Sequence, residues 1–235
     1  MKIISLSQDQ RKELSLILSK FKSYSQFSRN KDAAYRYAKV FKIRVCPYCN
    51  IHFIDTIPDI VRPEFDHFIP KSSPQGKGLE LDASNLIPAC HECNSIIKKD
   101  KIFDHKTHLH PFYDDFDSII RFCIDLISPD YLNEENFNII FIHQDKSSIY
   151  NSRANNTIRD LELKKRYQHH KDYVIEILRF IKHYNYQNYD NILNDIGIKT
   201  DFLFSLEILL SSFIDDCINN TPLGKLRRDI LLNYL

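Results

Sequence analysis

The sequence predicts an α+β fold that is mostly α-helical, with a small ββα unit embedded between flanking helices. Two observations support this prediction. Apolar residues recur at helical spacing near both ends of the chain. Between Val45 and Asp100, the chain instead contains most of its prolines and four of its six cysteines, with short β-favouring runs at 51–57 and 64–69. This central stretch has too few apolar residues to fold by burial alone, so we expect a bound metal ion to organise it.

The flanking segments carry helix start signals. Ser7 and Gln10 have the spacing of a capping box, in which each side chain satisfies the backbone N–H of the other residue. A second helix is expected to begin after Asn30. After Phe112 the chain is expected to be helical again, in an amphipathic stretch at 157–181, a helix at 201–217 and a terminal helix at 223–231.

These signals divide the chain into three parts. We expect N-terminal helices in residues 1–44 and the ββα unit with its cysteines in residues 45–112. Residues 113–235 are expected to form a helical region that binds a partner or the substrate.

Composition and charge describe an ordinary globular protein, with 43% hydrophobic and 27% charged residues. The N-terminus is polar and has no apolar core of a secretory signal, and no apolar run of about 18 residues is present. We therefore expect a cytoplasmic protein without a membrane span. The net charge of +1 excludes a strong overall basic field. Residues 145–184 are locally basic, which fits either a solvated helix face or a phosphate-binding surface.

Four cysteines form two Cys-x-x-Cys pairs, namely Cys46, Cys49, Cys90 and Cys93. Two such pairs supply the four thiolates of a closed, structural zinc site. A redox dithiol would be expected beside a βαβ pattern, which is absent, and disulfides are not expected in a cytoplasmic chain. The other two cysteines, Cys123 and Cys217, lie in apolar stretches expected to be helical and are interpreted as buried free thiols.

A second motif lies between and after the cysteine pairs. Asp66 and His67 are followed by Pro70, then by an Asn85-Leu pair, and Asn94 directly follows the last cysteine. This order, completed by the lysines that come next, resembles the HNH endonuclease family with a ββα-metal site, over about residues 45–101. The resemblance implies metal-dependent hydrolysis of phosphodiester bonds in nucleic acid, with DNA the favoured substrate and RNA, such as tRNA, the alternative.

The resemblance also implies roles for individual residues. His67 matches the general base, since an imidazole titrates near neutral pH and can take a proton from water. Asp66 and Asn94 match the two metal-ligand positions, and their oxygen donors favour Mg²⁺ or Mn²⁺. Many relatives have histidine where Asn94 stands, so looser metal binding is expected. Asn85 matches the asparagine that orients the base histidine, and it can also hold the intervening loop against the first strand.

Phosphate contacts that do not read bases are expected from the lysines after the second cysteine pair, Lys98, Lys99 and Lys101.

Each of the residues assigned to the site also has an ordinary structural interpretation. Asp66 could be a surface carboxylate, His67 a hydrogen-bonded structural histidine, Asn85 a turn residue and Asn94 a helix cap. Taken together in this order, these residues favour the interpretation that they form a catalytic site.

Other polar residues near the motif also have candidate roles. Glu64 lies two residues before Asp66, hence on the same strand face, and is a candidate auxiliary metal ligand or a residue that supports the ligands. His91 lies inside the second pair and is expected to be exposed, because four cysteines already complete the zinc site. The spacing of three further histidines fits no common metal site, so we expect structural roles for His105, His108 and His110.

The flanking regions carry a looser resemblance. A His-Pro-Phe-Tyr-Asp block at 110–114, and Asn155, Ile158 and Leu161 in the helical tail, are similar to HNH effectors of Septu and retron anti-phage systems, which act beside an ATPase subunit. The resemblance implies an ATPase partner for this chain. The rival interpretation is a non-catalytic zinc-ribbon adaptor that binds nucleic acid or protein and would have no need of the Asp-His pair and Asn94.

Overall fold

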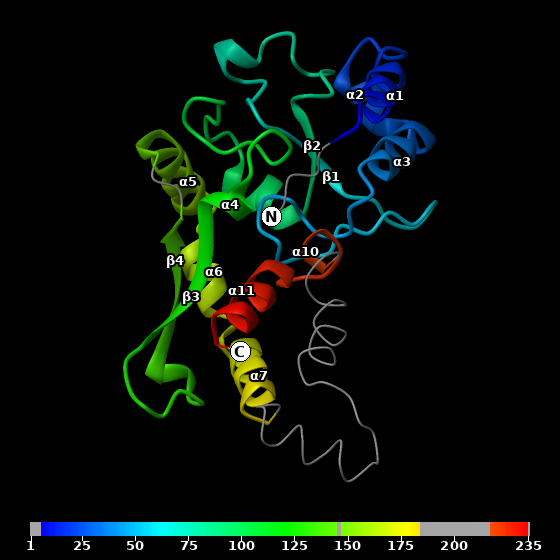
Figure 1. Ribbon diagram of the computed structural model, residues 1–235. Helices are drawn as coiled ribbons and strands as arrows, with labels where there is room; N and C mark the ends of the chain where they lie inside the picture. The colour runs from blue at the N-terminus through cyan, green and yellow to red at the C-terminus, as the bar shows by residue number, and fades with distance from the viewer. Residues whose placement is uncertain (1–5, 145–146, 184–216, 235) are drawn as a thin grey trace.

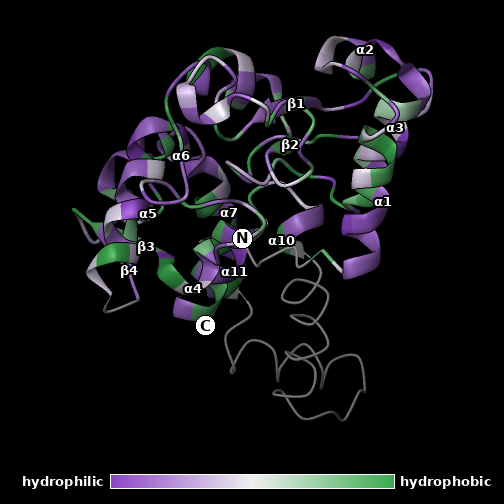
Figure 2. Ribbon diagram, turned by 90° about the horizontal axis from the view of Figure 1, so that it is seen from above, coloured by the Kyte–Doolittle hydropathy of each residue, from purple (hydrophilic) through white to green (hydrophobic). Residues whose placement is uncertain are grey.

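The computed structural model describes residues 6–144, 147–183 and 217–234 (Figure 1). Three helices begin the chain, α1 (Gln8–Leu18), α2 (Tyr24–Arg29) and α3 (Lys31–Val40). The predicted capping box at Ser7 is confirmed, because its Oγ accepts from the N–H of Gln10 and the Gln10 side chain accepts from the N–H of Ser7. Helix α3 begins after Asn30 as predicted, and the structure shows that the Asn30 side chain caps it. Figure 2 shows hydrophobic and hydrophilic residues alternating along α1 and α3, as in helices with one buried face.

The central unit is a ββα arrangement. Strands β1 (Glu64–His67) and β2 (Leu86–Ala89) pair antiparallel, with Glu64 opposite Ala89 and His67 opposite Leu86. The short helix η1 (Pro74–Gly76) lies in their connection, and η2 (Glu92–Lys98), a π-helical segment, follows β2. The β-favouring run at 51–57 forms only isolated bridges, Val45 with Phe53 and Ile57 with Val61.

A second hairpin lies on the side of the molecule opposite α1–α3, with β1 and β2 between (Figure 1). After α4 (Phe116–Ile119), strand β3 (Ile120–Leu126) pairs antiparallel with β4 (Phe137–His143), which follows η3 (Glu134–Asn136). The prediction of helix in this region was wrong. Ile120, Phe122 and Ile124 are buried and alternate with more exposed residues, which is the period of two that marks a strand with one covered face.

Cys123 differs from its prediction because this region forms a strand and not a helix. Cys123 lies on β3 and is only half-buried, so it is not a buried helical thiol. The side chain of Cys217 lies outside the described residues.

The C-terminal helices are α5 (Ser148–Asp160), α6 (Leu163–Gln168), α7 (Lys171–His183), α10 (Cys217–Asn220) and α11 (Gly224–Tyr234). The amphipathic stretch predicted at 157–181 is not one helix but divides among α5, α6 and α7. Between α5 and α6, Glu162 has a left-handed backbone with φ of 54°. The terminal helix is confirmed as α11. Of the helix predicted at 201–217, residues 201–216 lie outside the described part. Among the described residues, no helix is both long and apolar enough to span a bilayer.

Helices from the C-terminal third pack directly on the first cysteine pair. The Tyr167 hydroxyl donates to the carbonyl of Cys49 at 2.7 Å, and Tyr167 is fully buried. The side chain of Asn50 bonds to the Ile218 carbonyl and accepts from the N–H of Lys225. One continuous hydrophobic cluster includes α1, β1–β2, β3–β4, α7 and α11. The central unit is therefore held on several sides by residues distant in sequence.

Candidate functional site

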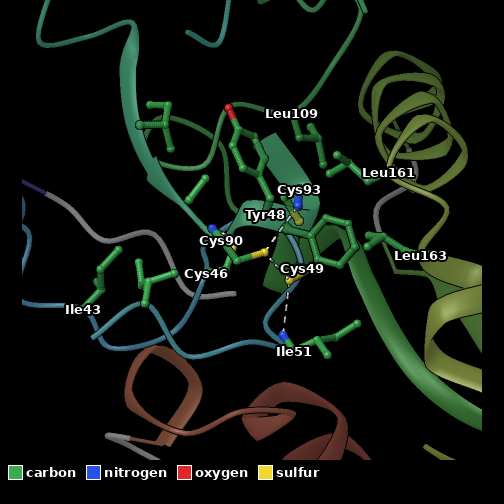
Figure 3. Packing of buried hydrophobic residues seen from close by; sticks show 14 of the residues in the cluster. Ile43, Cys46, Tyr48, Cys49, Ile51, Cys90, Cys93, Leu109, Leu161 and Leu163 are labelled. Atoms are coloured by element: carbon green, nitrogen blue, oxygen red, sulfur yellow. Dashed lines mark hydrogen bonds between the residues drawn. The ribbon is translucent and has the colours of Figure 1, made fainter. Parts of the chain in front are cut away.

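The four paired cysteines converge on one point. Their Sγ atoms all lie within 4.8 Å of one another, and every one of these side chains is buried. Figure 3 shows the sulfurs between the first cysteine loop and the start of η2, beside Tyr48, Leu161 and Leu163. Backbone N–H groups point at the sulfurs, for example Ile51 N–H at Cys49 and Cys90 N–H at Cys46, each at 3.4 Å. Four converging thiols with N–H donors fit a closed, tetrahedral zinc site.

Burial and one hydrogen bond define the state of the candidate base. The Nε2 of His67 lies 3.1 Å from the carbonyl oxygen of Glu80, and the ring packs edge-on against Tyr24 with centroids 4.6 Å apart. A carbonyl oxygen can only accept, so Nε2 carries the proton and the lone pair of the neutral ring is on Nδ1. Burial lowers the pKa of His67 below its usual value, with the Glu80 carbonyl opposing this in part. The ring is therefore neutral near pH 7, as a general base must be.

Asn85 holds the loop that supplies this carbonyl. Its Oδ1 accepts from the N–H of Ile69 at 2.7 Å, and its Nδ2 donates to the carbonyls of Ile69 and Leu79 at 3.1 and 3.3 Å. Leu79 directly precedes Glu80, whose carbonyl contacts His67. Asn85 thus fastens the segment around Glu80 to the chain just after β1. This arrangement fits the two roles expected of Asn85.

Asp66 lies inside the protein, not on its surface. Its Oδ1 accepts from the Nζ of Lys98 at 3.0 Å, and its Oδ2 accepts from the Tyr48 hydroxyl at 2.5 Å. Burial and the neighbouring Asp66 carboxylate raise the pKa of Tyr48 well above its usual value, so the hydroxyl remains a donor. Lys98 also donates to the carbonyl of His67 at 2.8 Å. Sequence reasoning missed Tyr48, although it lies inside the first cysteine pair.

The structure corrects the prediction that Lys98 contacts phosphates. Its side chain is fully buried, because a buried carboxylate needs a counter-charge and Lys98 supplies it to Asp66. Lys99 and Lys101 are exposed. The Nζ of Lys101 donates to the carbonyl of Asp160 on α5 at 2.6 Å.

Asn94 faces Glu64 across the gap between η2 and β1. Its Nδ2 donates to the Glu64 carboxylate at 2.8 Å, and Ser95 and His91 bond to the same carboxylate at 2.6 and 2.7 Å. Burial opposes ionisation of Glu64, but these three hydrogen bonds outweigh it and hold the pKa of Glu64 below its usual value. Successive pairs thus join β1 to η2, Glu64 with Asn94 and Asp66 with Lys98. Asp66 and Asn94 thus belong to two different contacts between β1 and η2. The structure shows no hydrogen bond between the side chains of Asp66 and Asn94.

The three later histidines are not a metal cluster. Among the described residues, the cysteines form the one group of three or more His, Cys, Asp or Glu side chains close enough to share an ion. The Nδ1 of His110 accepts from the N–H of Phe112, and its Nε2 donates to the carbonyl of Ser84. His108 bonds to Asp160 and Thr107. These contacts fit the expected structural roles. His91 has a side chain 61% exposed, as expected.

His110 makes stability depend on pH. Burial lowers the pKa of His110 to about 3, compared with about 6.5 in an unfolded chain. Between these values the unfolded chain binds a proton that the folded chain does not, so the free energy of unfolding falls as pH drops from about 6.5 towards 3. The full effect is on the order of 5 kcal/mol. Urea unfolding of the wild type and of His110→Gln at about pH 7, 6 and 5 should show a shallower pH dependence in the variant.

The comparison of two slopes is needed because burial also lowers the pKa values of His67, His108 and His170. Those histidines contribute equally to both proteins. Equal slopes in wild type and variant would refute the assignment to His110.

Comparisons with known proteins agree with this geometry over the central unit. The family model described as HNH endonuclease matches residues 46–100. No curated protein and no solved structure matches the chain. Residues 46–100 therefore carry an HNH endonuclease domain whose buried four-cysteine cluster fits an HNH family with a cysteine zinc site.

Proposed function

We propose that the protein is a metal-dependent HNH endonuclease that hydrolyses phosphodiester bonds in nucleic acid, with His67 as the general base. The observation that carries this proposal is the state of His67. Its Nε2–H is bound by the Glu80 carbonyl, Asn85 fastens that loop in place, and the ring is neutral with its lone pair on Nδ1. A water molecule at Nδ1 would lose its proton to the ring as it attacks phosphorus.

Asp66 and Asn94 would hold the catalytic divalent cation, with Glu64 beside them. Carboxylate and amide oxygens suit Mg²⁺ or Mn²⁺, and the Nδ2 of Asn94 already bonds to Glu64, so its Oδ1 is directed elsewhere. When bound, the cation would supply Lewis-acid stabilisation of the phosphate and the leaving oxygen. The ammonium of Lys98 competes for the Asp66 carboxylate. This competition supports loose metal binding.

The substrate contacts in this proposal come from exposed basic residues. Lys99 and Lys101 follow η2 and are exposed, and in this proposal they contact phosphates near the bond that is cut. Lys101 would have to exchange its bond to the Asp160 carbonyl for the phosphate. Two basic residues of the 145–184 stretch point inward instead. Arg153 pairs with Asp114, and Arg166 contacts Cys93. DNA is the favoured substrate and RNA the alternative, since hydrolysis by an external water needs no 2′-hydroxyl.

The proposed activity is tested by incubating the purified chain with plasmid DNA and with total cellular RNA, in Mg²⁺, Mn²⁺ or EDTA. Cutting of one polymer with either metal and none in EDTA is expected, and it would identify the substrate. Cutting that persists in EDTA would contradict the metal-dependent mechanism. No cutting of either polymer, even with the partner ATPase present, would favour the zinc-ribbon adaptor.

We further propose a role in anti-phage defence together with an ATPase. Its support is the looser sequence resemblance, and the structure limits where a partner could bind. Ile158 and Leu161 are buried in the core, so of the tail residues that carry the resemblance only Asn155 is exposed. Co-purification of an ATPase encoded beside this chain tests the proposal, and a monodisperse chain that is fully active alone would contradict it.

A further inference from the structure

Arg166 lies against the cysteine cluster from outside the HNH domain. It is on α6, and its Nη1 donates to the Sγ of Cys93 at 3.3 Å and to the carbonyl of Leu161 at 3.4 Å. Its Nη2 is buried and has no hydrogen-bond partner among the described residues. A buried guanidinium donor without a partner is costly, so its retention beside four thiols requires a reason.

The negative charge of the four-thiolate zinc site is that reason. Four thiolates around Zn²⁺ carry a net charge of −2 (four negative charges against two positive), and the cysteines are buried, so the site must be compensated by nearby donors or cations. The backbone N–H groups at the sulfurs provide dipoles only. Arg166 provides a full positive charge in direct contact with Cys93. Hydrogen bonds from charged donors are roughly twice as strong as those between neutral groups.

The neighbours of Arg166 hold it in place. Tyr167 donates to the carbonyl of Cys49, in the first cysteine pair, while Arg166 contacts Cys93 in the second. Gln168 bonds to both the N–H and the carbonyl of Ile139 on β4, at 3.1 and 2.7 Å. Three consecutive residues of α6 thus join both cysteine pairs to the second hairpin.

We propose that Arg166 is a positioning residue of the zinc centre, which donates to the Cys93 thiolate and offsets part of the negative charge of the four thiolates. Retention of zinc then depends on α6, a helix outside residues 46–100. A change in the packing of the C-terminal region would consequently change how firmly the centre retains zinc. This inference depends on the cysteine cluster and not on the proposed nuclease activity.

The experiment uses the full chain with Co²⁺ or Zn²⁺ bound, and compares Arg166→Met, Arg166→Lys and Lys165→Met with the wild type. Lys165 is the matched control, because it lies on the same helix with its side chain 83% exposed. Two quantities are measured for each protein, the rate of zinc transfer to a chelator and the energy of the thiolate-to-cobalt charge-transfer band. Circular dichroism establishes that each variant is folded.

Arg166→Met is expected to release zinc about tenfold faster or more. Its charge-transfer band should move to lower energy, because a thiolate that loses a hydrogen bond gives up an electron more readily. Arg166→Lys should restore most of both properties, and Lys165→Met should match the wild type. If Arg166→Met does not fold, Arg166→Gln serves for the same measurements.

Wild-type release together with an unshifted band in the folded neutral variant would overturn the proposal. So would equally fast release from the Met and Lys variants without any shift of the band, because that result indicates lost packing and not a lost charge.

Discussion

Replacing His67 by alanine is expected to abolish detectable cleavage, a loss of roughly 10²- to 10⁴-fold for a missing general base. The folded chain keeps the ring neutral, with Nε2–H bound by the Glu80 carbonyl, so Nδ1 is the atom that would take the proton from water. Alanine has no group that can do this. The rate is measured on the polymer that the wild type cuts, under single-turnover conditions with saturating Mg²⁺ or Mn²⁺, and zinc content is determined in parallel.

Two further variants separate chemistry from structure in this experiment. His67→Gln retains a side-chain donor for the Glu80 carbonyl but has no basic nitrogen, and it should be as inactive as alanine. His105→Ala removes an exposed histidine shortly after the HNH domain and should cut at the wild-type rate. Folding and stoichiometric zinc are expected in all three variants. An unchanged rate in His67→Ala would refute the assignment of His67 as the general base.

Cys93→Ser is expected to lose zinc and to destabilise the chain. The Sγ of Cys93 lies within 4.8 Å of the other three, and a serine hydroxyl does not replace a thiolate as a zinc ligand. Structural zinc contributes about 10–16 kcal/mol of apparent binding free energy in small zinc-organised peptides. We therefore expect a loss of about 4 kcal/mol or more, and a melting temperature lower by roughly 10 °C for a chain of this size.

Cys123→Ser is the matched control for the cysteine experiment. Cys123 is half-buried on β3, and its sulfur accepts a hydrogen bond from Asn233, which a serine oxygen can also accept. This variant should retain one zinc per chain and a melting temperature near that of the wild type. Zinc is measured by atomic absorption, and unfolding by circular dichroism. Stoichiometric zinc and an unchanged melting temperature in Cys93→Ser would rule out the four-cysteine zinc site.

The sequence alone determined the parts of this protein that depend on short-range patterns. The capping box at Ser7 and the cap at Asn30 act within a few residues, so their side chains reveal them directly. The spacing of the two Cys-x-x-Cys pairs also predicts that they come together in one four-cysteine site, because four thiolates at this spacing have few other uses in one chain. The order of strand, loop, strand and short helix between Glu64 and Lys98 follows from the same local motif.

Only the tertiary structure decided which charged side chains contact the buried carboxylate and the cysteine cluster. Lys98 has the sequence context of a surface lysine, and its inward direction follows only from the burial of Asp66 across the space between β1 and η2. The contact of Arg166 with Cys93 joins residues 73 positions apart. No local pattern encodes such pairs. A buried charge takes whichever opposite charge the fold brings within reach, because leaving it unpaired costs more than ordering a distant side chain.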